Sequence, residues 1–405
     1  MTQRLYYHDS FLYNFEAEVQ EVAETPKPAL ILDRTAFYPT SGGQVFDTGV
    51  IETSAETLNV TEVADTEDGR VIHYLEAPPK DIKPGAKIRG LIDASRRRDH
   101  MQQHTGQHVL SAAFVRLYNA LTVSFHMGDD YCSIDLDTPN LTRDQVEQAE
   151  RLANEIILEN RQVQIRFVTR EEAGKLGLRK LPPAERDELR LIDIHDFDLC
   201  ACGGTHVNQT GQIGCILLRK TEKVRQGWRV EFNAGQRAVA TARRDFITLT
   251  EAAGLFSAHI YDLPTQARKL LDEARTLRKQ REQVQEELTE AQAAAILAET
   301  NESGGHKLVV RTFADRDMNS LKLLAQKLTR LAPNVVTLLG ATSPKPSLIF
   351  AQSIGQCRDM GAVMKDTLSK FGGRGGGSKD LAQGGLPSSD AVPSAIAHAS
   401  AALGS

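Results

Sequence analysis

A seven-residue repeat of apolar side chains between residues 264 and 300 is the feature that most limits how this chain can fold. One series consists of Leu270, Leu277, Val284 and Ala291, and a second consists of Ala267, Ala274, Leu288 and Ala295. Arg281 interrupts the second series once, and the charges between the apolar positions are dense and balanced. This pattern is typical of a coiled-coil arm or a helical hairpin, although a solvated single helix shares it. We therefore expect an arm between two folded parts of the chain.

The patterns on either side of the arm predict four parts and a mixed α+β fold. Residues 1–92 carry short apolar runs separated by Pro, Gly and Asp, which indicate a β-barrel-like domain with a glycine motif. Residues 93–245 alternate helical runs with short strands, as in an α+β domain. The arm spans 246–303, and residues 304–405 follow as a compact C-terminal α/β domain.

The composition is that of an ordinary globular protein. The 405 residues are enough for two or three domains, and 41% apolar with 25% charged residues argue against wholesale disorder. Five cysteines are an odd, sparse set, which favours a reducing compartment over a secreted disulfide scaffold. The N-terminus lacks the apolar core of a signal peptide, and no apolar run approaches the ~20 residues of a membrane span. We expect a cytoplasmic protein with no membrane partner.

Three histidines lie four residues apart in the segment DHMQQHTGQHVL: His100, His104 and His108. On a helix this spacing places the imidazoles on one face, where two of them can share a metal ion, although paired histidines also occur on solvated faces. The pattern is not that of a zinc protease, because such an enzyme needs a glutamate directly after the first histidine of its pair, and Thr105 follows His104 here. Gln107 cannot act as a general base, so peptide hydrolysis of that kind is disfavoured.

A second candidate half-site is the segment CACGGTH at residues 200–206. Cys202 and His206 are four residues apart, and thiolate and imidazole are preferred zinc ligands. The two glycines between them let the backbone turn sharply. Cys200 and Cys202 can also be small buried residues or a redox-sensitive pair. Together with the histidine pair, however, the segment completes a tetrahedral ligand set, which predicts one zinc ion per chain.

Three motifs in this order resemble those of one family. HTGQH followed at a distance by CGGTHV is similar to the editing domain of alanyl-tRNA synthetases. The segment FYPTSGGQ at residues 37–44 looks like the glycine-rich segment that precedes that domain. The segments GGRGGG and DLAQGG, between residues 372 and 385, resemble the C-terminal domain of the same synthetases. We therefore expect no aminoacylation domain upstream of the editing-like region. The chain therefore resembles a free-standing alanyl-tRNA editing protein of the long AlaX type.

The resemblance implies zinc-dependent hydrolysis of the ester that joins a wrong amino acid to alanine tRNA, chiefly serine, with glycine as a second candidate. The implied zinc ligands are His104, His108, Cys202 and His206. His100 is interpreted as an outer or exposed residue, and a register in which it replaces His108 stays open; Cys200 is the less favoured thiolate. We favour zinc that orients the amino acid over zinc that activates water, because no carboxylate accompanies the histidine pair as a base.

Selection of serine over alanine requires a pocket that hydrogen-bonds the serine hydroxyl, because an apolar pocket cannot separate the two strongly. The segment LTVSFHMG at residues 121–128 corresponds to the family's pocket strand, with Phe125-His126 where many synthetases carry Gln-Lys. The substrate-binding candidates are Thr122, Ser124, His126, Thr105 and Gln44. Ordinary polar residues of a strand remain an equal interpretation of Thr122 and Ser124.

The net charge of −5 hides basic clusters that lie beside the three motifs. The predicted tRNA-binding residues are Arg96, Arg97, Arg98, Arg219, Lys220, Arg225, Lys370, Arg374 and Lys379. Basic side chains beside glycine backbone suit phosphate contacts, although a solvated surface is the alternative for each cluster. The expected partner is alanine tRNA, held at its acceptor end and at its elbow, with the arm setting the spacing. A homodimer through the arm or the glycine tract stays open.

Two other functions compete with editing. A non-catalytic tRNA-binding protein with a structural zinc ion is compatible with four protein ligands. A nucleic-acid phosphoesterase is less favoured, because Asp99-His100-Met101 is not the Asp-His-His that such enzymes need.

Overall fold

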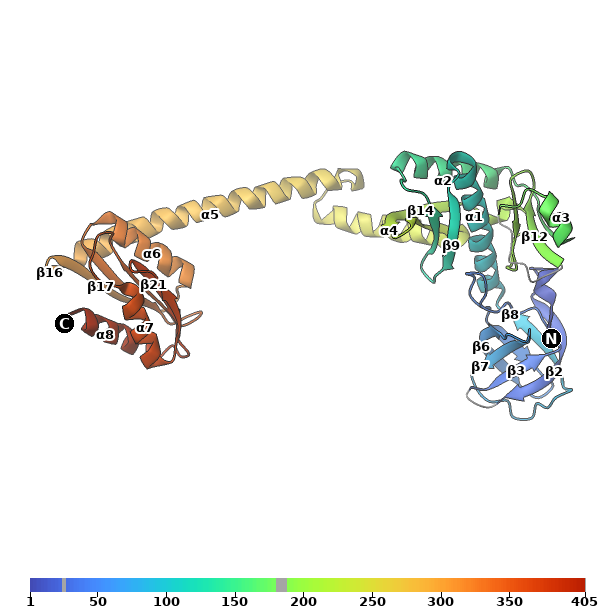
Figure 1. Cartoon of the computed structure of the whole chain (residues 1–405), viewed down its shortest axis with the longest axis horizontal. Helices are drawn as coiled ribbons and strands as arrows, with labels where there is room; N and C mark the ends of the chain where they lie inside the picture. Colours follow the sequence, from blue (N-terminus) through green and yellow to red (C-terminus); the bar gives the residue numbers. More distant parts are fainter. Residues whose placement is uncertain (24–26, 180–187, 405) are drawn as a thin grey trace. The chain divides into compact units, whose positions relative to one another are not determined.

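Figure 1 shows the computed structural model of the chain, which describes residues 1–23, 27–179 and 188–404. Contacts divide the chain into two compact units, Met1–Ala252 and Ala253–Ser405. The first unit holds a closed six-stranded barrel and a mixed helix–sheet part, and the second contains a long helix and an α/β sandwich. The predicted α+β class, with its N-terminal barrel and C-terminal α/β domain, is confirmed.

Six strands close into the barrel in the order β2-β3-β7-β6-β5-β8. They are β2 (Asn14–Ala23), β3 (Ala29–Leu32), β5 (Gly49–Glu52), β6 (Thr57–Asp65), β7 (Val71–Leu75) and β8 (Lys87–Ile92). Alternate side chains point inward, as in β7, where Val71, His73 and Leu75 are buried. Next to the barrel, β1 (Gln3–Arg4) and the 3-10 turn η1 (Leu5–Tyr7) precede β2, and β1 pairs in parallel with β4 (Arg34–Thr35).

A buried helix, α1 (Ala94–Tyr118), follows the barrel directly. It begins at Asp93, whose carboxylate accepts hydrogen bonds from the amides of Ser95 and Arg96, and it ends at Asn119 in the left-handed conformation. It packs on a four-stranded sheet of order β14-β15-β10-β9 and on a second helix. These elements are β9 (Leu121–Met127), β10 (Cys132–Asp137), α2 (Arg143–Leu158), β14 (Ile216–Val224) and β15 (Gly227–Ala234).

A separate three-stranded antiparallel sheet, β11-β12-β13, completes this part. Its elements are β11 (Val163–Thr169), the short helix α3 (Arg170–Lys175), β12 (Glu188–Ile194) and β13 (Asp198–Ala201), and the turn η2 (Thr210–Ile213) follows. The end of β13 leads straight into the Cys202–His206 turn, so this sheet determines where that half-site begins.

The predicted arm is a long helix whose apolar seam is uncovered. After α4 (Gly235–Leu255) and the turn η3 (Ile260–Asp262), α5 runs from Leu263 to Glu299. Leu270, Leu277 and Val284 are 54%, 64% and 61% exposed, so no described part of the same chain covers this seam. Only the last turns of α5 bury residues, against the C-terminal sheet and its first helix.

The C-terminal sandwich has a six-stranded sheet of order β16-β17-β18-β19-β21-β20. Its elements are β16 (Glu302–Ser303), β17 (His306–Phe313), α6 (Met318–Leu331), β18 (Val335–Ala341), β19 (Ser347–Gln352), α7 (Met360–Phe371), β20 (Arg374–Gly377), β21 (Leu381–Gly385) and α8 (Ala391–Gly404). The end of α5 and α6 cover one face of the sheet, while α7 and α8 cover the other (Figure 1). The glycine tract forms the exposed edge strand β20. Among the described residues, no helix is long and apolar enough to cross a membrane.

Candidate metal centre

Four potential metal ligands converge in the first unit. They are His104, His108, Cys202 and His206, and their ligand atoms all lie within 4.8 Å of one another. The Cys202 Sγ atom lies 3.4 Å from His104 Nε2 and 3.3 Å from His206 Nε2. Three of the residues are buried and Cys202 is half-buried. One thiol and three imidazoles at this separation can hold a metal ion.

The local backbone explains why these side chains meet. His104 and His108 are one turn apart on α1 and share its buried face. The Cys202 amide donates to the Arg190 carbonyl of β12 at 3.1 Å, and Arg190 Nη1 donates back to the Cys202 carbonyl at 2.6 Å. These two bonds fix the turn that brings Cys202 and His206 over α1.

The two glycines of the turn have different roles. A Cβ on Gly204 would lie 2.1 Å from His104 Cε1, which is far inside contact distance. A Cβ on Gly203 would have Tyr7 Oη as its nearest neighbour, at 3.6 Å, which is ordinary contact. The His104 ring therefore occupies the space that any side chain at position 204 would need.

Each imidazole has an outer partner on its Nδ1 atom. His104 Nδ1 lies 2.7 Å from Gln44 Oε1, His108 Nδ1 lies 3.2 Å from Asp198 Oδ2, and His206 Nδ1 lies 3.2 Å from Thr105 Oγ1. The Gln44 and Asp198 oxygens can only accept, so they place the ring protons of His104 and His108 on Nδ1 and leave the Nε2 lone pairs for a metal ion. The outer partners thus orient the rings in the way that ligation requires.

Electrostatics favour the ligating protonation state of two of the four residues, Cys202 and His206. Burial by itself raises the pKa of the Cys202 thiol, but the adjacent His104 and His206 outweigh it and hold that pKa well below its ordinary value. Burial lowers the pKa of His206 to about 3, against smaller opposing contributions from Cys202. A thiolate beside a neutral imidazole is the combination that a metal ion binds.

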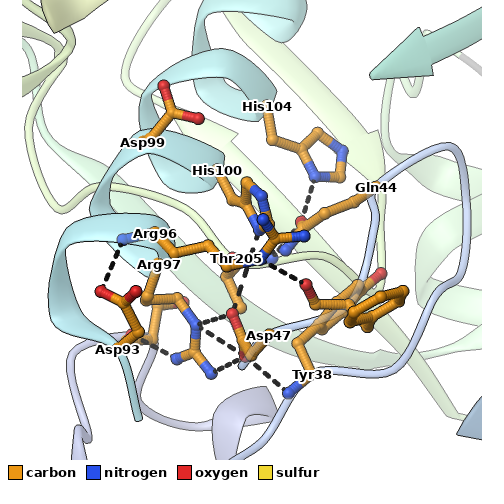
Figure 2. A network of polar contacts seen from close by, with 12 residues as sticks. Tyr38, Gln44, Asp47, Asp93, Arg96, Arg97, Asp99, His100, His104 and Thr205 are labelled. Carbon is orange, nitrogen blue, oxygen red and sulfur yellow. Dashed lines mark hydrogen bonds and ion pairs between the residues drawn. The ribbon is translucent and has the colours of Figure 1, made fainter. Parts of the chain in front are cut away.

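The barrel domain contributes Gln44 from its glycine-rich loop, and Figure 2 shows its carboxamide beside His104. The Thr205 amide donates to Gln44 Oε1 at 3.1 Å, while Gln44 Nε2 donates to Thr205 Oγ1 at 2.9 Å. Because a backbone amide can only donate, these contacts fix which way the carboxamide faces. Gln44 therefore connects the barrel, α1 and the Cys202–His206 turn.

Two of the predicted substrate residues contact the cluster, and the other three lie on β9. Thr105 and Gln44 lie at the cluster as described, and the Phe125 ring of β9 packs against His104 with ring centroids 5.4 Å apart. Thr122 is half-buried, and its hydroxyl lies 2.6 Å from that of Ser111.

The other two strand candidates do not contact the cluster. Ser124 donates to Asp135 on the neighbouring strand, and His126 is exposed. His100 and Cys200 are buried but lie outside the four-residue cluster. His100 Nδ1 has no hydrogen-bond partner among the described residues, and burial, followed by the charges of Arg96 and Arg237, lowers its pKa to about 3.

Asp198 was not predicted as a site residue, and Phe125 was predicted only to differ from the family. Asp198 lies four residues before Cys202, but an isolated acidic residue at the start of a strand has no pattern that marks it as an outer partner. Phe125 departs from the family's glutamine, and this departure was the signal that the position needed attention.

Most of the predicted tRNA-binding residues already have partners. Arg219 pairs with Asp245, Lys220 pairs with Glu222, Lys370 Nζ lies 3.2 Å from His398 Nδ1, and the Arg96 guanidinium lies over the Phe46 ring. Four are exposed and have no ion pair within the described ranges: Arg98, Arg225, Arg374 and Lys379.

Arg97 differs from the rest because it is completely buried and paired with the equally buried Asp47 (Figure 2). Its guanidinium also donates to the carbonyls of Ser10 and Ala36. A run of three arginines reads as a surface cluster, but here the middle one joins the barrel to α1. With no exposed surface it cannot reach a phosphate in this fold, so we remove Arg97 from the tRNA contacts.

Three family models match successive parts of the chain. Residues 3–96 match "tRNA synthetases class II (A)", residues 189–230 match "Threonyl and Alanyl tRNA synthetase second additional domain", and residues 291–405 match "DHHA1 domain". The site and these matches define a protein related to parts of the alanyl-tRNA synthetases.

Individual relatives narrow this class. Alanine–tRNA ligase of Thermococcus kodakarensis is 32% identical over 414 residues, which is 100% of this chain and 44% of that protein. The chain thus spans less than half of the ligases that it matches. "Alanyl-tRNA editing protein AlaX-L" of Pyrococcus horikoshii is 30% identical over 95% of this chain and 94% of its own length. The C-Ala domain from Aquifex aeolicus alanyl-tRNA synthetase aligns with 24% of this chain and 92% of that chain at 24% identity, with a TM-score of 0.23. The chain belongs to the AlaX-L family of alanyl-tRNA editing proteins.

Proposed function

We propose that this protein is a deacylase that removes wrongly attached amino acids, chiefly serine, from alanine tRNA, with glycine as a second substrate. The observation that carries the proposal is the buried cluster of one thiol and three oriented imidazoles in a chain of the AlaX-L family. The name of the Pyrococcus relative, an alanyl-tRNA editing protein, supports the same substrate class.

Zinc is the metal ion that best fits this ligand set. Zinc–sulfur bonds of about 2.3 Å and zinc–nitrogen bonds of about 2.0–2.1 Å at tetrahedral angles put sulfur and nitrogen about 3.5 Å apart. The separations from Cys202 Sγ to His104 Nε2 and His206 Nε2 are 3.4 Å and 3.3 Å. When bound, zinc would supply Lewis-acid polarisation of the ester carbonyl.

The residues of the chain would act mainly by positioning. The Phe125 ring beside His104 offers an apolar wall against which the amino acid can lie. An aminoacyl ester is already activated, so a fixed orientation contributes much of the acceleration. Thr122, a half-buried residue of the same strand, is our candidate for recognising the serine hydroxyl.

Hydrolysis of charged tRNA tests the proposal. We expect the purified protein to release serine rapidly from alanine tRNA that carries serine. It should leave alanine tRNA that carries alanine intact. Removal of metal with a chelator should stop the release, and added Zn²⁺ should restore it. Equal persistence of both esters would contradict the proposal, and together with tRNA binding it would favour the non-catalytic alternative.

A further prediction concerns the C-terminal unit, where we propose contacts to the tRNA elbow. Arg374 is the first residue of the glycine edge strand β20 and Lys379 follows the strand, and both are exposed. Replacing both with alanine should weaken binding of alanine tRNA and reduce the slope of log K against log salt concentration by about 1 for each side chain that binds a phosphate. Lys345→Ala, at another exposed lysine of the same unit, is the control. An unchanged salt slope in the double variant would exclude these contacts.

Light scattering on the same samples would show whether two chains associate.

A further inference from the structure

A buried pair of opposite charges lies next to the four candidate metal ligands. Asp198, the first residue of β13, has a side chain that is 2% exposed, and Arg179, which follows α3, has one that is 12% exposed. Arg179 Nε lies 2.8 Å from Asp198 Oδ1, and Arg179 Nη2 lies 3.1 Å from Asp198 Oδ2. The guanidinium therefore binds both carboxylate oxygens, which is the most directional form of this ion pair.

The same carboxylate contacts one of the candidate metal ligands, His108. Asp198 Oδ2 accepts from His108 Nδ1 at 3.2 Å, so the chain Arg179–Asp198–His108 runs from near the surface to a ligand. The other two imidazoles have uncharged outer partners, the Gln44 carboxamide and the Thr105 hydroxyl. His108 is thus the ring in the cluster whose outer partner carries a charge.

This difference has a chemical consequence. A carboxylate on Nδ1 raises the basicity of the imidazole, whereas a carboxamide or a hydroxyl mainly fixes its orientation. A buried carboxylate also needs a cation to remain charged and in place, and Arg179 is positioned to be that cation. The Arg179 amide donates to the Leu199 carbonyl at 3.0 Å, which ties the arginine to the same strand as the aspartate.

We propose that Arg179 and Asp198 form a positioning pair that sets how tightly the cluster retains its metal ion, acting through His108. Neither residue contacts substrate in this role. The inference rests on the proposed metal site and adds to it the residues that determine metal affinity.

The test measures the affinity of the full-length protein for Zn²⁺ by competition with a chromogenic chelator, with no tRNA present. Asp198→Asn keeps an acceptor for His108 and removes the charge, and we expect it to weaken Zn²⁺ binding by about 10- to 100-fold. Arg179→Lys keeps a positive charge without the two-point geometry, so its affinity should fall between those of Asp198→Asn and the unmodified protein.

The matched control is Asp193→Asn on the adjacent strand β12. Asp193 is also paired with an arginine, Arg166, but it is partly exposed and does not contact the cluster. Asp193→Asn should bind Zn²⁺ like the unmodified protein. Circular dichroism confirms that each variant is folded at the temperature of the measurement.

The outcomes separate this inference from the proposed function. If the unmodified protein binds one Zn²⁺ per chain and folded Asp198→Asn binds it within two-fold as tightly, the positioning pair is overturned while the metal site stands. A lower melting temperature with unchanged affinity would show a purely structural pair and would also overturn the inference. If the unmodified protein binds no Zn²⁺, the proposed metal site itself fails.

Discussion

Cys202→Ala should leave the protein without its bound metal ion and abolish the release of serine from alanine tRNA. Cys202 Sγ lies within hydrogen-bonding distance of two of the imidazoles in the cluster, and its depressed pKa makes it the anionic member of the ligand set. Its removal leaves the cluster with three imidazoles and no thiolate. Loss of a direct ligand should exceed the about 10- to 100-fold loss expected from an outer partner.

Elemental analysis of the purified variant gives the metal content, and hydrolysis of serine-charged alanine tRNA gives the activity. Cys200→Ala is the control, because Cys200 is a buried cysteine two positions earlier that lies outside the cluster. It should retain one metal ion and near-normal activity. A full complement of metal in Cys202→Ala, or its loss in Cys200→Ala, would show that the ligand set is wrong.

Arg97→Met should destabilise the first unit by about 3–5 kcal/mol. The substitution keeps the apolar stem but leaves Asp47 as a buried carboxylate without its cation, which is costly in a low-dielectric interior. The carbonyls of Ser10 and Ala36 lose a donor at the same time. Urea denaturation followed by circular dichroism measures the change in the free energy of unfolding.

Arg98→Met is the matched control, since Arg98 is the next residue on the same helix, is exposed and has no ion pair within the described ranges. It should change the free energy of unfolding by no more than about 0.5 kcal/mol. A loss below about 1 kcal/mol in Arg97→Met would mean that the barrel and α1 do not depend on this pair.

Much of the fold could be predicted because its signals are local. Alternating burial in β7 and the helical spacing of α1 both follow from residues close together in the sequence. The α/β class of the C-terminal domain was predicted for the same reason. The exposure of the α5 seam within the chain could not be predicted from the repeat, because the heptad pattern is the same whether or not another segment covers it.

The spacing predicted the two half-sites and the family resemblance implied the four ligands, but the surroundings of these ligands depend on tertiary contacts. Gln44 and His104 are 60 positions apart, and His108 and Asp198 are 90 apart, so no local pattern could pair them. The burial of Arg97 was missed because its partner Asp47 lies in another domain. Ser124 and His126 were reasonable pocket candidates by position, but the side chain of this strand that packs against His104 is Phe125.

The unequal roles of the two adjacent glycines have a consequence for recognising distant homologues. Alanine at position 203 would meet only ordinary contacts, whereas alanine at position 204 would displace a metal ligand. A search pattern that requires both glycines would discard working proteins, and one that permits substitution at both would admit chains with no intact metal site. Only the second glycine should count as diagnostic when such chains are sorted from genome sequences.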